Sequence, residues 1–269
     1  MSTSKPVTLI TGGSAGIGAA LARVFAERGH ATVLVARREA KLTALADALA
    51  AEGRERPQVM AIDLADTDSG DRIARELVGR GLEPEIVVNN AGFGLAGEAA
   101  TLDRGRQLAM VDLNVRLVTD LSLRWTESLA RHRGGVLNIA SVASFFPGPG
   151  MAVYYATKAY VLSFSEALHY ELAGRGIKVT AVCPGPVPTE FQALAGIAGD
   201  RLSPLLTRSS SRIARDAYDG LMAGRRVVVP GFANRIAALL PRFVPRALML
   251  SIVGAYQRNV SGPTTGRVE

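Results

Sequence analysis

A tyrosine and a lysine four residues apart carry the clearest chemical signal in this sequence. In the stretch YYATKAY, Tyr154 and Lys158 have a spacing that puts both side chains on one face of a helix, and Tyr155 lies three residues before the same lysine. A phenol with a pKa of about 10 exchanges protons near neutral pH only if its anion is stabilised, and a nearby ammonium group does this. The pair therefore predicts acid–base chemistry. The alternative is an exposed helix with a solvated lysine and two half-buried tyrosines.

A glycine-rich turn near the N-terminus is the second signal. Residues 11–18, TGGSAGIG, follow the apolar run VTLIT and precede an amphipathic stretch. Glycines at this position allow a tight turn and a close approach of the backbone to a pyrophosphate, which then sits at a helix N-terminus. The turn therefore predicts a dinucleotide site, with a purely structural turn as the alternative.

Basic residues follow the second apolar run, where many dinucleotide sites have an acidic residue for the ribose hydroxyl. Arg37 lies 19 residues after Gly18, and Arg38 comes next. Guanidinium groups suit a 2′-phosphate, so the sequence predicts NADP(H) rather than NAD(H), with Ser14 as a further hydrogen-bonding group. A solvated arginine pair at the start of a helix is the alternative.

Polar residues also follow the third and fourth apolar runs. Asp63, in IDL, is predicted to accept a hydrogen bond from the adenine amino group. In NNAG, Asn89 is expected to tie neighbouring strand ends together and Asn90 to contact the cofactor, while Ala91 and Gly92 leave room for it.

The elements that must position these residues alternate between strands and helices. Six nearly continuous apolar runs read as strands buried on both faces of a parallel sheet, and RRVVVPG near Val229 is expected to add a seventh. The runs are VTLIT, ATVLVA, QVMAIDL, EIVVNNAG, GVLNIAS and KVTAVCPG, and the helices between them are predicted at about 17–28, 39–51, 68–80, 103–131 and 153–173. This alternation predicts one doubly wound α/β domain, whose ligands bind at the carboxyl ends of the strands.

The order of the motifs resembles the short-chain dehydrogenase/reductase family over roughly residues 5–230. The resemblance rests on TGGSAGIG, NNAG, Ser141, Tyr154 with Lys158, and the Pro184–Gly185 pair. It implies a Rossmann-type seven-stranded parallel sheet and hydride transfer between a nicotinamide and an alcohol or carbonyl carbon. The arginine-rich hydrophobic tail is similar to that of the bacterial DltE-type branch.

The resemblance also implies a catalytic set. The general acid maps to Tyr154 rather than Tyr155, and the family's serine and asparagine map to Ser141 and to Asn114 in DLNV. Tyr154 would donate a proton to the developing oxyanion and Ser141 would hold it by a hydrogen bond, while Lys158 favours the tyrosinate and reaches the nicotinamide ribose. Asn114 would hold a water, and Ser144 is expected to be a turn or substrate-loop residue. The predicted cofactor contacts are Gly12, Ser14, Ile17, Gly18, Arg37, Arg38, Asp63, Leu64, Asn90, Ala91, Gly92, Tyr154, Lys158, Pro184, Gly185, Val187 and Thr189.

Composition and charge narrow the function classes. The 269 residues suit one large domain, and the net charge of +7 comes from residues 200–269, which have 11 Lys and Arg against 4 Asp and Glu. These arginines are spaced among apolar residues rather than in a basic tract with aromatics, so no nucleic-acid partner is expected. The sequence has one cysteine, Cys183, and its N-terminus shows no secretory pattern. Both features favour a cytoplasmic protein. The three histidines are scattered, so no metal site is expected.

The role of the chain from about residue 189 to the C-terminus is less clear from the sequence. Residues 1–230 are predicted to form the NADP-binding catalytic domain, with a substrate lid at about 189–208 that is loop-like from Phe191 to Thr207 and apolar enough to suggest a lipophilic substrate. Residues 231–269 form a hydrophobic, arginine-rich extension. It is interpreted as a subunit contact in a homodimer or homotetramer, a wall of the substrate pocket, or an amphipathic segment resting on an anionic membrane surface.

Three functions remain open from the sequence. The first is an NADP(H)-dependent oxidoreductase that reduces a lipophilic ketone or aldehyde. The second is a 3-oxoacyl thioester reductase, because a basic patch could steer a phosphorylated carrier or coenzyme A. The third is a catalytically silent NADP-binding sensor or scaffold, which the complete set of Asn114, Ser141, Tyr154 and Lys158 disfavours.

Overall fold

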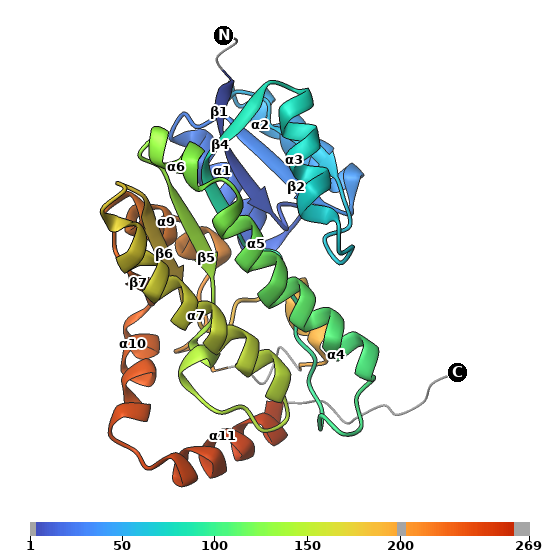
Figure 1. The fold of residues 1–269 in the computed structure, drawn as a ribbon. Helices are drawn as coiled ribbons and strands as arrows, with labels where there is room; N and C mark the ends of the chain where they lie inside the picture. The colour runs from blue at the N-terminus through green and yellow to red at the C-terminus, as the bar shows by residue number, and fades with distance from the viewer. Residues whose placement is uncertain (1–3, 198–202, 261–269) are drawn as a thin grey trace.

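A seven-stranded parallel sheet forms the centre of the molecule (Figure 1). The computed structural model describes residues 4–197 and 203–260. The strand order is β3-β2-β1-β4-β5-β6-β7, with every neighbouring pair parallel. This confirms the predicted seven-stranded doubly wound sheet. The strands are β1 (Lys5–Thr11), β2 (Thr32–Ala36), β3 (Gln58–Ala61), β4 (Leu82–Asn89), β5 (Gly135–Ile139), β6 (Lys178–Val182) and β7 (Val227–Val228).

Helices cover both faces of the sheet and bury two apolar layers. On one face, α1 (Gly16–Glu27), α2 (Glu39–Ala51) and α9 (Ser210–Met222) pack around the fully buried Phe25. On the other face, α3 (Ser69–Gly79), α5 (Leu117–Arg124), α6 (Thr126–Arg131) and α7 (Ala152–Ala173) pack on the same strands. Strands buried from both sides are nearly continuously apolar, which is the pattern the sequence shows.

The stretch predicted as one helix at 103–131 is divided into four segments. It contains α4 (Arg104–Val111), a π-helical turn η1 (Asp112–Arg116), α5 and α6, with a break at Trp125 between the last two. A π-helical turn widens the helix by one residue and is common at functional sites. Here it falls on Asn114, one of the predicted catalytic residues.

The sequence predicted a loop from Phe191 to Thr207. This prediction is wrong for the first part of that stretch, because α8 (Glu190–Ala195) is a helix. Thr189 caps this helix, and Gln192 completes a capping box with it. Gly196, in the left-handed region with φ 76°, ends the helix. Helix α9 was not predicted from the sequence, and residues 198–202 of the predicted lid lie outside the described part of the chain.

The C-terminal extension forms α10 (Phe232–Leu239), the short turn η4 (Leu240–Arg242) and α11 (Arg246–Val260). Figure 1 shows α10 leading away from the β7 edge and α11 passing beneath the start of α7. Gln257 of α11 donates a hydrogen bond to the Tyr155 hydroxyl (2.7 Å). Among the described residues, no helix is long and apolar enough to span a bilayer. The domain division at 230 stays a prediction.

Candidate active site

Two hydroxyl groups meet at the carboxyl end of β5. Ser141 follows β5 and caps the short 3-10 helix η2 (Val142–Phe145), where its Oγ accepts a hydrogen bond from the Ala143 amide (3.1 Å). Tyr154 lies in the first turn of α7, and its hydroxyl shares a hydrogen bond with Ser141. The structure therefore brings together the serine and the tyrosine that the sequence placed at this site.

Lys158 lies one turn further along α7 and is buried. Its Nζ donates to the Ile139 carbonyl oxygen (2.8 Å) and lies 5.9 Å from the centroid of the Tyr154 ring. Burial lowers the pKa of Lys158 to about 8, because the charged form loses its water shell.

The expected acidification of Tyr154 by this lysine is not found. Burial raises the pKa of Tyr154 above its ordinary value, although the hydrogen bond from Ser141 acts in the opposite direction. The phenol therefore keeps its proton at neutral pH and has the form of a proton donor.

Asn114 connects the loop after β4 to α7. Its Oδ1 accepts from the Phe93 amide (3.2 Å), and its Nδ2 donates to the Phe93 carbonyl (3.0 Å) and to Thr157 Oγ1 (3.1 Å). A Cβ added to Gly92 would lie 2.8 Å from Asn114 Oδ1 and 3.6 Å from Lys158 Nζ. Both amide protons of Asn114 are thus donated to groups of the protein, and these bonds hold the loop after β4 against α7. The expected role of Asn114 in holding a water stays a prediction.

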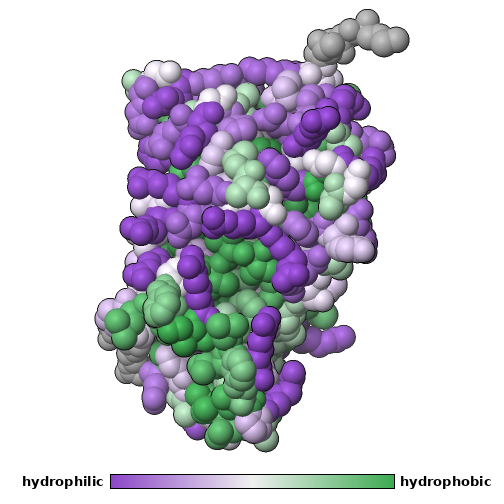
Figure 2. All heavy atoms as spheres, turned by 90° about the vertical axis from the view of Figure 1, so that its left-hand side faces the viewer, coloured by the Kyte–Doolittle hydropathy of each residue, from purple (hydrophilic) through white to green (hydrophobic). Residues whose placement is uncertain are grey.

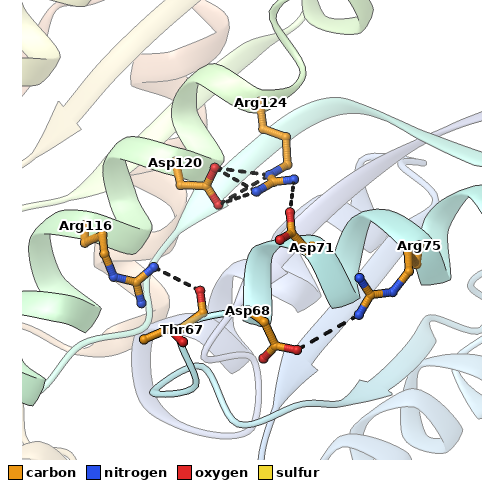
Figure 3. Close-up of polar contacts among 7 residues, drawn as sticks. All are labelled: Thr67, Asp68, Asp71, Arg75, Arg116, Asp120 and Arg124. Carbon is orange, nitrogen blue, oxygen red and sulfur yellow. Dashed lines mark hydrogen bonds and ion pairs between the residues drawn. The ribbon is translucent and has the colours of Figure 1, made fainter.

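Ionic contacts between α3 and α5 support the helix that follows Asn114 (Figure 3). Arg124 of α5 pairs with Asp71 of α3 (2.7 Å) and with Asp120 of its own helix (2.9 Å). Arg116 donates to the Thr67 carbonyl oxygen just before α3 (3.1 Å). The π-helical turn is therefore anchored immediately after Asn114.

The glycine-rich turn has the geometry that a bound pyrophosphate requires. Gly12 has a positive φ of 67°, and a Cβ on Gly18 would lie 2.2 Å from the Gly12 carbonyl oxygen. Helix α1 begins after Ala15, which supplies no side-chain cap, so its first amide groups are left to hydrogen-bond an anion. Ile17 is partly buried and packs against the core behind the turn.

The NNAG residues hold this turn in place. Thr11 Oγ1 accepts from the amides of Asn90 (3.0 Å) and Ala91 (3.1 Å), and Asn90 Nδ2 donates back to the Thr11 carbonyl (2.9 Å). Asn89 donates to Asn138 of β5 (2.8 Å), as expected for a residue that ties strand ends together. A direct cofactor contact by Asn90 stays a prediction.

A basic cluster follows β2. Arg38 donates to Ser14 Oγ (3.1 Å) and to Glu190 (2.6 Å), and Lys41 pairs with the other oxygen of Glu190 (2.6 Å). Sequence reasoning missed Lys41 and Glu190. The position of Lys41 three residues after Arg38, on one helix face, could have indicated the first of them.

The other residues predicted for the adenosine end are placed differently. The Arg37 side chain is 72% exposed, and its guanidinium lies 3.8 Å from Asp63. Asp63 also accepts from the Ala65 amide (3.0 Å), and Leu64 is buried in the core beside it. Their contacts with a cofactor stay predictions.

At the other end of the site, the segment after β6 is fixed by its own contacts. The Pro184 carbonyl accepts from the Val142 amide (2.9 Å), and the Gln192 side chain donates to the Val187 carbonyl. A Cβ on Gly185 would lie 2.5 Å from Asn234 Oδ1 of α10. Thr189 starts α8, with its Cγ2 only 3.1 Å from where a Cβ on Gly16 would lie. Helix α8 therefore begins beside the glycine-rich turn.

Apolar side chains surround the Tyr154 ring. A Cβ on Gly94 would lie 3.0 Å from the Phe191 ring, 3.1 Å from Tyr154 and 3.2 Å from Met151 Cε. The rings of Tyr154 and Phe191 are 5.5 Å apart. The Tyr154 ring thus lies beside an apolar wall that α8 helps to form.

Ser144 and Cys183, two further residues with nucleophilic side chains, make structural contacts in this region. Ser144 lies in η2, where its Oγ donates to the Lys158 carbonyl (2.8 Å), and burial raises the pKa of Cys183 to about 12. The part of the chain that the structure describes contains no group of His, Cys, Asp or Glu able to hold a metal.

Comparison with known proteins assigns the family. Residues 6–196 match the short chain dehydrogenase family. Sulfoacetaldehyde reductase 2 of Chromohalobacter salexigens is 35% identical over 198 residues, which cover 72% of this chain and 77% of that protein. A short-chain dehydrogenase from Sphingobium yanoikuyae in complex with NADPH has a TM-score of 0.77 at 33% identity, with 90% and 97% of the two chains covered. The bulky-bulky ketone specific alcohol dehydrogenase from Comamonas testosteroni has a TM-score of 0.74 at 29% identity, with 91% and 97% covered.

The chain belongs to the short-chain dehydrogenase/reductase family. It is an oxidoreductase of that family and binds a nicotinamide cofactor. The chain's own residues fit such a group, because the glycine-rich turn, the uncapped start of α1 and the Ser141–Tyr154 pair line one edge of the sheet. Membership of the DltE-type branch stays a prediction.

Proposed function

We propose that this protein is an NADPH-dependent carbonyl reductase for a lipophilic ketone or aldehyde, with Tyr154 as the general acid. The observation that carries the proposal is the hydrogen bond between the Ser141 and Tyr154 hydroxyls beside the apolar wall of Met151 and Phe191. NADPH, when bound, supplies the hydride. The remaining chemistry is the handling of charge and protons by this chain.

Reduction of a carbonyl builds negative charge on its oxygen, and two hydroxyl groups that donate hydrogen bonds to this oxygen stabilise that charge. Tyr154 donates its proton to the oxygen, and Ser141 stabilises the same oxygen by a hydrogen bond. Lys158, with its pKa lowered to about 8, is mainly an ammonium ion at pH 7. Its charge lies 5.9 Å from the Tyr154 ring, where it stabilises the tyrosinate left by the transfer. General acid catalysis of this kind contributes roughly 10²–10⁴-fold.

The preference for NADPH rests on the basic cluster after β2. Arg38 and Lys41 converge on the Glu190 carboxylate, and Arg38 also donates to Ser14 Oγ. A 2′-phosphate offers the same charge and more acceptor oxygens, and arginine binds phosphate in a bidentate way. NADH has a 2′-hydroxyl in place of this phosphate and so offers these cations no negative charge at that position. Arg37 and Asp63 are the further contacts that we expect at this end.

The apolar wall favours a lipophilic substrate over a small anionic aldehyde such as the one named for the Chromohalobacter relative. The name of the Comamonas structure points to bulky ketones. We expect the protein to act in the cytoplasm as a homodimer or homotetramer, which sedimentation would measure.

The test is NADPH oxidation with lipophilic ketones, aldehydes and 3-oxoacyl thioesters, repeated with NADH. We expect turnover of bulky ketones or aldehydes with NADPH and much slower turnover with NADH. Faster turnover of the thioesters would favour the 3-oxoacyl reductase instead. Tight NADPH binding without turnover of any compound would contradict the proposal and favour a sensor.

A further inference from the structure

The C-terminal extension leaves a large apolar surface exposed. Phe232 and Phe243 are 73% and 82% exposed, and six aliphatic side chains accompany them on α10, η4 and α11. Figure 2 shows hydrophobic side chains gathered on the lower half of the face that carries these elements, crossed by hydrophilic ones. Exposed apolar surfaces of this kind mark interaction sites. We call it the C-terminal patch: Phe232, Ile236, Leu239, Leu240, Phe243, Leu248, Leu250 and Ile252.

The charged residues of the extension itself have one sign. Residues 232–260 contain four arginines and no Asp or Glu. Arginines interleaved with exposed aromatic and aliphatic residues are the composition of segments that lie in the interface of an anionic bilayer. Helix α11 is apolar on two sides, because Met249 and Val253 are buried against the protein while Leu248 and Ile252, one turn apart, are exposed.

An arginine-lined cavity adjoins the patch. It has a volume of about 530 Å³ and is lined by Arg208, Arg212 and Arg235 together with Phe232 and a single carboxylate, Asp216. Phe232 belongs to both the cavity and the patch. A phosphate-bearing headgroup fits three guanidinium groups, while its acyl chains would lie along the neighbouring apolar side chains.

We propose that the C-terminal patch docks this enzyme on a membrane surface rich in anionic phospholipid, with an acidic headgroup in the arginine-lined cavity. The extension lies in the plane of the interface, since no helix of the described residues is both long and apolar enough to cross it. A second copy of this chain is a poorer occupant. In a two-fold contact the same surface meets itself, so Arg242 and Arg246 of one copy would face arginines of the other without a carboxylate from either extension.

Docking through this surface would place the catalytic site close to the bilayer. Asn234 of α10 donates to the carbonyl groups of Leu206 (3.0 Å) and Pro230 (2.8 Å), next to the segment that contains Gly185. Gln257 of α11 bonds to Tyr155, the neighbour of the proton donor. A lipophilic substrate dissolved in the membrane would then reach the site without crossing water. Only this last consequence rests on the proposed function.

The test is co-sedimentation of the full chain with vesicles of phosphatidylcholine alone or mixed with phosphatidylglycerol. We expect binding to the mixed vesicles that weakens with added salt, and little binding to phosphatidylcholine alone. Phe232→Ser/Phe243→Ser and Arg242→Gln/Arg246→Gln are each expected to lower the partition coefficient at least about ten-fold. The matched controls are Val78→Ser, an exposed apolar residue on α3, and Arg54→Gln/Arg56→Gln, on the loop after α2.

Two outcomes would overturn the proposal. The first is no binding to anionic vesicles, or equal losses in the patch variants and their controls, with circular dichroism confirming that all are folded. The second is a wild-type oligomer that the patch variants dissociate while vesicle binding is absent, which would assign the patch to a second copy. Since no readout uses turnover, failure here is distinguishable from failure of the proposed reductase activity.

Discussion

Replacing Lys158 by Met should change how stability depends on pH. The wild-type protein buries this ammonium group with a single carbonyl partner, and its pKa falls from 10.5 to about 8. A lysine whose pKa is lowered on folding destabilises the native state by its charge. The penalty is fully present below about pH 8 and disappears as the pH rises towards 10.5, where the side chain is neutral in both states.

The size of the effect follows from the shift. A difference between 10.5 and about 8 corresponds to roughly 3 kcal/mol at pH 7. Between pH 7 and pH 9.5, about 2 kcal/mol of this penalty is relieved in the wild-type protein and none in Lys158→Met. Loss of the hydrogen bond to Ile139 lowers the stability of the variant by a similar amount at both pH values. It therefore does not affect the comparison.

Urea unfolding at pH 7 and pH 9.5 measures this difference. We expect the free energy of unfolding of the wild type, relative to Lys158→Met, to rise by about 2 kcal/mol between the two pH values. Lys5→Met removes a lysine that is exposed in the folded state, and its difference from the wild type should stay nearly constant. A Lys158→Met difference equally independent of pH would refute the account of a desolvated site lysine.

Three further predictions concern the cofactor and the site. Arg38→Ala/Lys41→Ala should weaken NADPH binding about ten-fold or more while changing NADH binding little, as measured by fluorescence titration. Gly18→Ala should reduce the rise in Tm caused by NADPH, because the added Cβ would lie 2.2 Å from the Gly12 carbonyl oxygen. Asn114→Ala should lower stability to urea by about 1–3 kcal/mol, since it removes the Asn114 hydrogen bonds to the Phe93 amide and carbonyl and one of the two hydrogen bonds of Thr157 Oγ1. The same variant should lower kcat more than it changes the Kd for NADPH.

The sheet was predictable because its signal is local and repeated. Each strand is an apolar run followed by turn residues, and parallel strands buried on both faces need that composition. The Ser141–Tyr154 pair was predicted from the family resemblance. The spacing to Lys158 alone placed both Tyr154 and Tyr155 near the lysine and did not choose between them.

Features that depend on distant parts of the chain were not predictable from local patterns. The ion pairs of Glu190 with Arg38 and Lys41 join residues about 150 positions apart. A lowered pKa of Tyr154 was expected because Lys158 is close in sequence. In the structure both side chains are buried, and burial raises the pKa of Tyr154 and lowers that of Lys158. The capping box that makes α8 a helix was readable from Thr189 and Gln192, but the apolar residues after it obscured that signal.

The central claim is that Tyr154 gives up the proton, and the adjacent tyrosine provides the matched control. NADPH oxidation with the best substrate of the panel should fall by at least about 100-fold in Tyr154→Phe. It should change little in Tyr155→Phe, and both variants should bind NADPH as the wild type does. Equal turnover in the two variants, or a greater loss in Tyr155→Phe, would contradict the account.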